Sequence, residues 1–355
     1  MGRNQRIFYA CQAVAITGRG GALTPASVVK GMQSVGMSST YTLDQVFELG
    51  QIEIYENIEE VADVEVTLEK VLDGDKLIYD LTTEGACKTD LVAASKARCD
   101  VHVAIFDDGV SQATGVPRNV CYNSGMYVSS VSYNYSVDGS ATESVTLVGN
   151  DRFWNEKEIA ADPEDYRRGD TTGGEFIGNT APNTTWTNSS NITAVFDGTD
   201  EPVSGVVRRT NVDIVNSTLP KFLKRQGGDD APTEAGISDN AHIQSISVSA
   251  DFGQESIQEL GRFGPYHRYA SFPIEVTSDF EVIATSGSLL EVSGAAPNLL
   301  DQSIIVRDTA GHIIDLGSKN KLTSVSYSGG DTGGGNATIS YSFSNFNVLK
   351  VDGGA

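Results

Sequence analysis

The chain contains two segments in which apolar and polar side chains alternate with a period of two. In residues 61–71 one side of the predicted strand carries Val64, Val66 and Leu68, and the other side carries Glu65, Thr67 and Glu69. In residues 274–282 one side carries Ile274, Val276, Phe280 and Val282, and the other carries Glu275, Thr277, Asp279 and Glu281. A period of two is typical of a β-strand with one buried face and one solvated face. The two segments therefore predict two strands that each expose an acidic face.

These strands belong to a longer internal repeat. Residues 33–50 (QSVGMSSTYTLDQVFELG) and 244–261 (QSISVSADFGQESIQELG) have equal length and share their landmarks in the same order. The offset is 211 at both ends, because Gln33 matches Gln244 and Gly50 matches Gly261. The landmarks are Glu48, Leu49, Gly50 and Tyr55 in the first copy, and Glu259, Leu260, Gly261 and Tyr266 in the second. A repeat of this size indicates an ancient duplication of one structural unit.

The repeat continues beyond these landmarks with a different spacing. Residues 64–67 (VEVT) match residues 274–277 (IEVT) at an offset of 210. The tetrapeptide SVSY then occurs at 130–133 and again at 324–327. The alternative is a pair of unrelated β domains that merely share strand composition, but four landmarks in one order favour the repeat.

The repeat divides the 355 residues into two modules and a connecting segment. We predict a first module at 1–150, a polar linker or surface insertion at 151–204, and a second module at 205–355. The connecting segment starts with an acidic portion and continues with Gly, Asn, Thr and Ser, a composition typical of linkers. Each module is long enough to bury a core of its own.

Turn and strand signals make the predicted fold mainly β. Residues 130–148 indicate two long strands joined by Asp138 and Gly139, a dipeptide that suits a tight hairpin turn. The second copy has a longer, glycine-rich turn at 329–335. About one helix is predicted in each module, at 89–97 and at 297–302.

The chain is strongly acidic, with a formal net charge of -22 and a pI near 4.4. This charge argues against binding to nucleic-acid phosphates, because such binding depends on Lys and Arg that displace counterions. The apolar stretch at 7–16 is too short to span a bilayer and lacks a signal-peptide pattern, so we interpret it as a first strand.

All four cysteines, Cys11, Cys87, Cys99 and Cys121, lie in the first predicted module. Cys99 and His102 have a CxxH spacing, but no second ligand pair completes a zinc site. Free buried thiols are the simplest interpretation for a protein that folds in a reducing cytoplasm. The alternative is that some of the four form disulfides between neighbouring subunits in an oxidising exterior.

The sequence shows no arrangement typical of a catalytic or metal site. Its four histidines make no HxH or HExxH spacing, and no GxSxG element occurs. Adjacent Asp107 and Asp108 would point to opposite faces of a strand and are more typical of a turn. We therefore expect no enzymatic activity, no metal and no cofactor.

The ordered set of a QS strand, an ELG loop, a tyrosine, a [VI]EVT strand and a late SVSY hairpin resembles the tail tube proteins of long-tailed bacteriophages. The resemblance implies two tandem tail-tube-like β-sandwich modules, with long hairpins that form a ring barrel. It also implies a structural virion protein, assembled in the host cytoplasm, whose rings stack into the tail tube and leave a channel for DNA ejection. No catalytic residues are implied.

The resemblance also carries expectations about partners. Six tube modules close a ring, so a duplicated chain is expected to form a homotrimeric, pseudo-hexameric ring. Tail sheath, tape measure and baseplate proteins are the other expected partners, DNA would pass without specific binding, and no membrane is involved. The acidic strand residues Glu65, Glu69, Glu275 and Glu281 are candidates for the channel lining, although they would equally suit an outer surface.

Two other functions stay open from the sequence. A trimeric baseplate hub that caps the tube would also consist of duplicated tube modules. A glycan-binding adhesin would need an exposed aromatic cluster, and the only tryptophans are Trp154 and Trp186 in the connecting segment.

Overall fold

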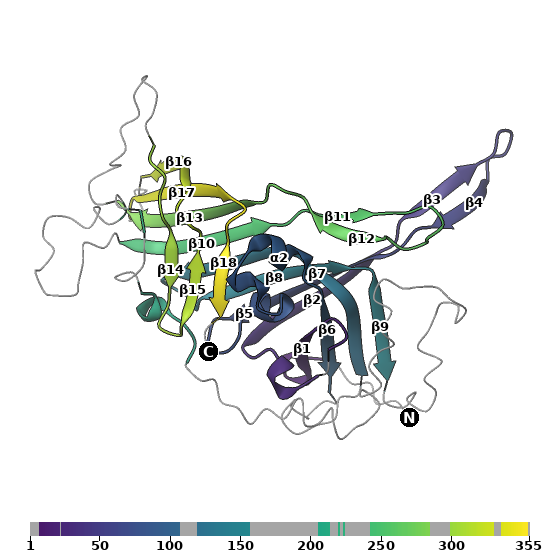
Figure 1. Ribbon diagram of the computed structural model, residues 1–355, viewed down its shortest axis with the longest axis horizontal. Helices are drawn as coiled ribbons and strands as arrows, with labels where there is room; N and C mark the ends of the chain where they lie inside the picture. Colours follow the sequence, from purple (N-terminus) through teal and green to yellow (C-terminus); the bar gives the residue numbers. More distant parts are fainter. Residues whose placement is uncertain are drawn as a thin grey trace, which may run out of the picture.

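One continuous sheet runs through both halves of the chain (Figure 1). The computed structural model describes residues 7–21, 23–106, 119–156, 205–213, 219–220, 223, 242–284, 299–329 and 335–353. Along its main path the sheet has the strand order β2-β5-β8-β7-β10-β13-β17-β16. These strands are β2 (Met32–Thr40), β5 (Asp63–Val71), β7 (Asn119–Ser136), β8 (Thr142–Gly149), β10 (Ile243–Asp251), β13 (Glu275–Ile283), β16 (Lys321–Ser328) and β17 (Thr338–Phe346). The prediction of a mainly β fold is confirmed, but within one chain the sheet is not closed into a barrel.

The two halves of this sheet have the same internal order. The first half runs β2-β5-β8-β7, the second runs β10-β13-β17-β16, and all neighbours are antiparallel. Both halves also share their irregularities, because the ladder shifts between Met32 and Ser34 as it does between Ile243 and Ser245. Residues at the same ladder position in the two halves are called counterparts below.

The ladders correct one predicted alignment. Val35 lies opposite Leu68, and its counterpart Ile246 lies opposite Phe280. The offset from β5 to β13 is therefore 212 (280 minus 68), and not the 210 that the VEVT and IEVT motifs suggested. A slip of two residues keeps every side chain on its original face, so alternation alone could not detect the error. The other offsets are 211 from β2 to β10, 194 from β7 to β16 and 196 from β8 to β17.

Strand β7 joins the main sheet to a second group of strands. Its first part pairs with β6 (Cys99–Ile105) and β9 (Asp151–Glu156), and β6 pairs with β1 (Gln12–Gly18). Gly125 has a φ of 62° at the transition, a value that suits glycine. The buried Asp100 carboxylate accepts hydrogen bonds from the Gly125 N–H at 2.8 Å and the Tyr122 hydroxyl at 2.9 Å. Because β9 pairs with β7, residues 151–156 form part of this second group of strands, although they lie in the segment predicted as a linker or surface insertion.

Two short helices and a small sheet contribute side chains to the same hydrophobic cluster as the main sheet. The hairpin at 130–148 and the helix at 89–97 are confirmed as β7–β8 and as α2 (Leu91–Lys96), and α1 (Ile78–Thr82) was not predicted. Strands β14 (Ile305–Arg307), β15 (His312–Asp315) and β18 (Lys350–Gly353) form a small sheet. The helix predicted at 297–302 is wrong in its described part, since Gln302 makes a β-bridge with Asn320. One hydrophobic cluster includes side chains from both halves, among them Leu68, Tyr133, Val248 and Phe280.

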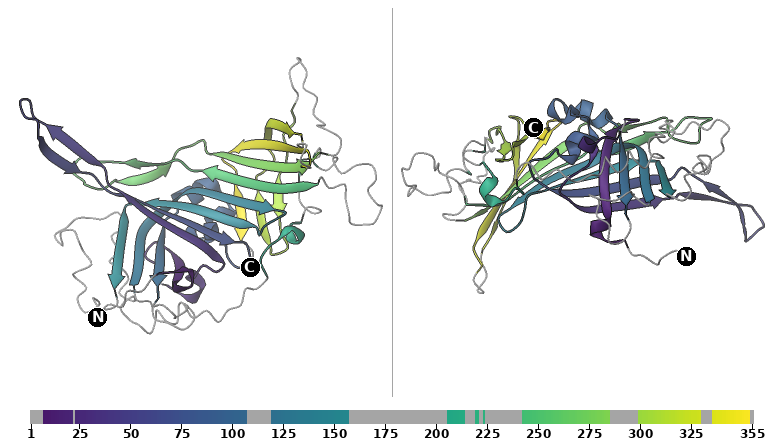
Figure 2. Two further views of the ribbon diagram at one scale, coloured as in Figure 1. Left: turned by 180° about the vertical axis from the view of Figure 1, so that it is seen from behind. Right: turned by 90° about the horizontal axis from the view of Figure 1, so that it is seen from below.

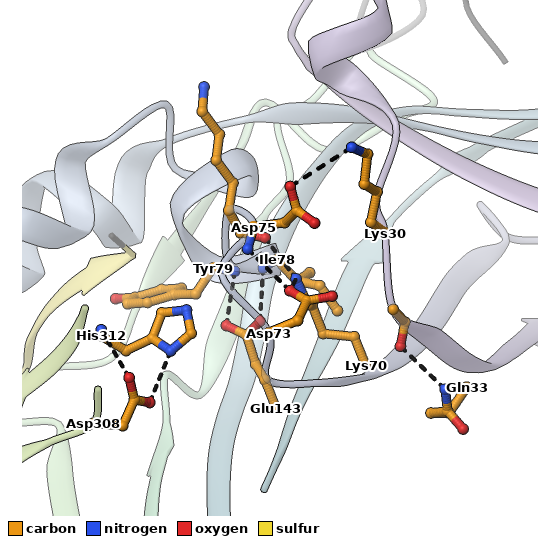
Figure 3. A network of polar contacts seen from close by, with 12 residues as sticks. Lys30, Gln33, Lys70, Asp73, Asp75, Ile78, Tyr79, Glu143, Asp308 and His312 are labelled. Carbon is orange, nitrogen blue, oxygen red and sulfur yellow. Dashed lines mark hydrogen bonds and ion pairs between the residues drawn. The ribbon is translucent and has the colours of Figure 1, made fainter. Parts of the chain in front are cut away.

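A buried ionic cluster distinguishes the first half from the second (Figure 3). Lys70 on β5 lies opposite Glu143 on β8, and both side chains are fully buried. The Lys70 ammonium donates to the Asp73 carboxylate at 3.1 Å and to the Lys76 carbonyl at 2.8 Å. The Glu143 carboxylate accepts from the Ile78 and Tyr79 N–H groups at 2.7 and 3.1 Å, where α1 begins. Burial raises the pKa of Glu143, and the Lys70 charge opposes that shift.

The counterparts of this buried pair are apolar. Val282 and Ile339 occupy the places of Lys70 and Glu143, and they also lie opposite each other. The second half therefore fills the same position with hydrocarbon. The first half uses the carboxylate to satisfy the first N–H groups of α1, which have no partner within the helix.

The four cysteines are free and buried, although the sequence also allowed disulfides between subunits. Burial raises the pKa of the Cys87 thiol to about 12 and that of the Cys121 thiol to about 11. It also raises the pKa of the Cys99 thiol. A disulfide to a neighbouring chain would require one of these thiols to reach the surface, so the structure favours the interpretation as buried thiols.

We predict that Lys70→Met destabilises the protein by about 3–5 kcal/mol, because it leaves the Asp73 and Glu143 carboxylates buried without their cation. Lys30→Met is the matched control, since Lys30 pairs with Asp75 at 3.7 Å near the surface and its loss should cost less than about 1 kcal/mol. Urea unfolding monitored by circular dichroism measures both. Equal effects of the two substitutions would contradict the account of the buried cluster.

We also predict that the native protein does not react with a disulfide reagent such as Ellman's reagent, because the reactive species is an accessible thiolate. In urea all four thiols should react. Fast modification of any thiol in the folded protein would contradict their burial and would revive the disulfide between subunits.

Candidate functional site

The main sheet presents one solvated face that is almost entirely polar. Burial alternates along β5, β8, β10 and β13, so residues at every second position of the sheet share this face. We call it the polar face; its residues are Ser34, Gly36, Ser38, Thr40, Glu65, Thr67, Glu69, Ser130, Ser132, Asn134, Ser136, Thr142, Ser144, Thr146, Val148, Ser245, Ser247, Ser249, Asp251, Glu275, Thr277, Asp279, Glu281, Ser324, Ser326, Ser328, Thr338, Ser340 and Ser342. Short hydroxyl side chains dominate, with carboxylates between them.

The four predicted acidic residues all lie on the polar face. Glu65 and Glu275 are exposed, and Glu69 and Glu281 are partly buried. Glu69 and Glu281 are counterparts, and each accepts a hydrogen bond from the serine opposite. Those serines are Ser34, at 3.2 Å, and Ser245, at 3.4 Å. The predicted alternation in 61–71 and 274–282 is therefore confirmed, while the role of these carboxylates in a channel stays a prediction.

The two halves meet edge to edge at the β7–β10 ladder. This ladder pairs residues 130–136 with residues 245–251, and Tyr133 lies opposite Val248. It is extended by the Val137 N–H to the Gln244 carbonyl at 3.0 Å and by the Phe252 N–H to the Ser129 carbonyl at 2.8 Å. Tyr133 and Phe252 are 1% and 0% exposed. The internal junction, as we call this ladder, joins the last strand of one half to the first strand of the other, and the side chains on one of its two faces are buried.

The same two strands are unpaired at the ends of the sheet. β2 is the counterpart of β10, β16 is the counterpart of β7, and neither has a second neighbour among the strands that the structure describes. The counterparts of Phe252 and Tyr133 are Tyr41 and Tyr327, which are 71% and 60% exposed. Each open edge therefore exposes a large aromatic side chain at a position where the internal junction has a buried aromatic side chain.

Each half carries a long hairpin directly after its first strand. The first consists of β3 (Leu43–Phe47) and β4 (Ile54–Glu59), and the second of β11 (Gln254–Ile257) and β12 (His267–Ala270). Both project from the same side of the molecule (Figures 1 and 2).

The repeated ELG landmarks form the turns at the hairpin tips. The Gln51 N–H donates to the Glu48 carbonyl at 3.2 Å, and the Arg262 N–H donates to the Glu259 carbonyl at 3.3 Å. Gly50 and Gly261 have φ values of 96° and 86°, as the third position of a type II turn requires. Leu49 and Leu260 are fully exposed at these tips, and Tyr55 and Tyr266 lie exposed beyond them.

The two hairpins differ in what they contact. The second hairpin lies across the ends of strands from the first half, where His267 Nδ1 is 3.1 Å from the Tyr127 hydroxyl. Arg268 pairs with the Asp63 carboxylate and donates to the Asn150 side chain at 3.2 Å. The Gln254 amide donates to the Val128 carbonyl at 2.9 Å. The first hairpin, in contrast, is exposed at every residue of both its strands.

The described part of the chain holds no group of three His, Cys, Asp or Glu side chains that could bind a metal ion. Within the same part, no helix has the length and apolar character needed to cross a bilayer. Asp107, Asp108, Trp186 and most of the glycine-rich turn at 329–335 lie outside the described residues. Trp154 is on β9 and is about half exposed.

Sequence reasoning found the ELG loops, the β7–β8 hairpin and the acidic face but missed the open edges. Tyr41 and Tyr327 became significant only when their counterparts Phe252 and Tyr133 were known to be buried. The repeat contains the signal, because Tyr41 aligns with Phe252 at the offset of 211. The order of strands in the sheet, however, is needed to interpret it.

No protein-family model and no curated protein matches this chain. Among solved structures, the chain is similar to a chain of the anti-feeding prophage (AFP) baseplate, with 11% identity and a TM-score of 0.31 over 43% of this chain and 98% of that one. It is also similar to a chain of the anti-feeding prophage tube-terminating cap, with 12% identity and a TM-score of 0.32 over 44% of this chain and 95% of that one. Each likeness covers less than half of this chain.

Proposed function

We propose that this protein is a structural subunit of a phage tail, whose copies join head to tail through the open edges β16 and β2 into a closed ring. One observation carries the proposal: the internal junction already joins the counterparts of these two edges. A contact between β16 of one copy and β2 of the next would repeat a contact that the chain makes within itself.

The internal junction also supplies the register of the proposed contact. Ser132 lies opposite Ser249, and Tyr133 lies opposite Val248. With the offsets of 194 and 211, Ser326 would lie opposite Ser38 of the next copy and Tyr327 opposite its Met37. Exposed aromatic side chains at both edges would then become buried, as Tyr133 and Phe252 are within the chain.

Head-to-tail contacts of this kind generate rings or filaments, and closure depends on the rotation between copies. Because each chain carries two matching halves, three copies give a ring of six halves with pseudo-sixfold symmetry. Closure also removes both open edges, which would otherwise be sites of uncontrolled strand pairing. We interpret the matching halves as the product of a duplication.

In this ring we place the polar face towards the channel. A channel lined with hydroxyls and carboxylates stays hydrated and repels DNA phosphates, so DNA can pass without adhering. Glu65, Glu69, Glu275 and Glu281 would contribute to that lining. Stacking of such rings gives a tail tube, with sheath, tape measure and baseplate proteins as its neighbours, whereas isolated trimers would indicate a baseplate hub.

The first test removes a main-chain donor from an open edge. In an antiparallel ladder, every second residue of a strand points its N–H towards the same neighbouring strand. The Val137 N–H donates to β10 and the Phe252 N–H donates to Ser129 of β7, so the Val131 N–H also points towards β10. Its counterpart Val325 should point its N–H towards the neighbouring copy. Val325→Pro should therefore weaken ring formation by about tenfold or more, since it removes one hydrogen bond and obstructs close pairing.

Sedimentation velocity and negative-stain microscopy measure the outcome. The thermal unfolding of the variant should stay close to that of the wild type, because proline is tolerated on an edge strand. Met37→Pro on the opposite edge should have the same effect. A wild-type protein that stays monomeric at all concentrations, or Val325→Pro rings as stable as wild-type rings, would contradict the proposal.

A further inference from the structure

We infer that the exposed first hairpin of one copy lies across the second half of its neighbour, and that the contact includes an ion pair between Glu56 of the hairpin and Lys321 of the neighbour. The inference rests on the proposed ring and identifies the residues that make its contact selective. The occupant of the surface is a second copy of this chain.

The template is the second hairpin, which makes the corresponding contact within the chain. His267 contacts Tyr127 at the start of the main-sheet part of β7, and Arg268 contacts Asp63 at the start of β5. Both partners lie at the same end of the first half. The hairpin therefore continues the internal junction beyond the ladder and adds side-chain contacts to it.

The counterparts of these residues carry complementary charges. The hairpins align at an offset of 211, since Leu43 pairs with Glu59 as Gln254 pairs with Ala270. His267 therefore corresponds to Glu56. Tyr127 corresponds to Lys321, because Tyr127 lies opposite Val148 and Lys321 lies opposite Ser344. A neutral contact within the chain becomes a carboxylate facing an ammonium group between chains.

The second pair is also complementary. Arg268 corresponds to Asn57, and Asp63 corresponds to Glu275. An Asn57 amide can donate a hydrogen bond to the Glu275 carboxylate, so the ion pair within the chain becomes a polar contact between chains. Glu56, Asn57 and Glu275 are all exposed in the single chain and are therefore available for this contact.

Lys321 already has two polar partners in its own chain. Its ammonium group lies 2.7 Å from the Asp301 carboxylate and donates to the Leu299 carbonyl at 2.6 Å. The lysine side chain is 52% exposed, and an ammonium group has three donors, so one donor is left for Glu56 of the neighbour.

The ion pair between chains has a physical consequence. Screening by salt weakens exposed ion pairs but has little effect on the main-chain hydrogen bonds and buried side chains of the internal junction. Ring assembly should therefore weaken as salt rises, while the internal junction and the fold of the chain should not. A charged pair that occurs only between chains also favours the correct edge partner by electrostatic complementarity.

The test is a charge exchange measured by sedimentation velocity in low and high salt. Lys321→Glu in an Asp301→Asn background should weaken ring formation by about three- to tenfold in low salt, through repulsion from Glu56. Adding Glu56→Lys to that variant should restore assembly, and Asp301→Asn alone should leave it unchanged. The unfolding temperature of each monomer checks that the chain still folds.

The outcomes separate this inference from the proposed function. Rings of the wild type that are equally stable in all charge variants would overturn the ion pair and leave the edge contact intact. Loss of rings in Lys321→Glu that Glu56→Lys does not restore would assign Lys321 a role within its own chain and overturn the pair. A wild-type protein that forms no rings would overturn the proposed function itself.

Discussion

The architecture depends on the ladder between β7 and β10. This ladder makes one sheet of two halves, and it determines which edges the chain leaves open. Because both halves have the same strand order and are joined last strand to first, the free edges must be the counterparts of the two strands in the junction. The counterparts of the main-chain donors and aromatic side chains at the open edges are therefore already paired inside the same molecule. The shared polar face and the contact of the second hairpin with the first half both follow from the continuity of this sheet.

The two halves match in their backbone more than in their side chains. The first half contains the Lys70 and Glu143 cluster that caps α1, whereas Val282 and Ile339 fill the same place in the second half. The second hairpin is anchored by Arg268 and His267, whereas the first is exposed. The first difference occurs where the first half carries α1, which the second half lacks among the described residues. The second difference occurs because the second hairpin contacts the first half, whereas the first hairpin is exposed. Unequal side chains on an equal backbone would allow the internal contact and the proposed contact between chains to differ in strength.

Much of the fold could be predicted from the sequence, because its signals are local. The alternation in 61–71 and in 274–282 gave the exposed face, and the ELG landmarks gave the two turns. The alignment of β5 with β13 was wrong by two residues, because the period of a strand cannot distinguish such a slip. Lys70 follows Val66 and Leu68 at the same two-residue period, so the pattern places it on the buried face of the strand. Its partner Glu143 is distant in sequence, and the pairing of the two could not be predicted. The open edges could not be predicted, since they depend on strand order and not on any local motif.

The most direct measurement of the central claim is a disulfide between engineered cysteines at the two edges. Ser326 and Ser38 are the counterparts of Ser132 and Ser249, which lie directly opposite each other in the internal junction. They form a pair without hydrogen bonds between them, and the Cα atoms of such a pair lie about 4.5 Å apart. The account predicts that Ser326→Cys with Ser38→Cys gives covalent trimers on a non-reducing gel, while Ser326→Cys with Thr40→Cys, displaced by two residues, gives far less. Monomers alone from the first pair, or equal cross-linking of both pairs, would contradict it.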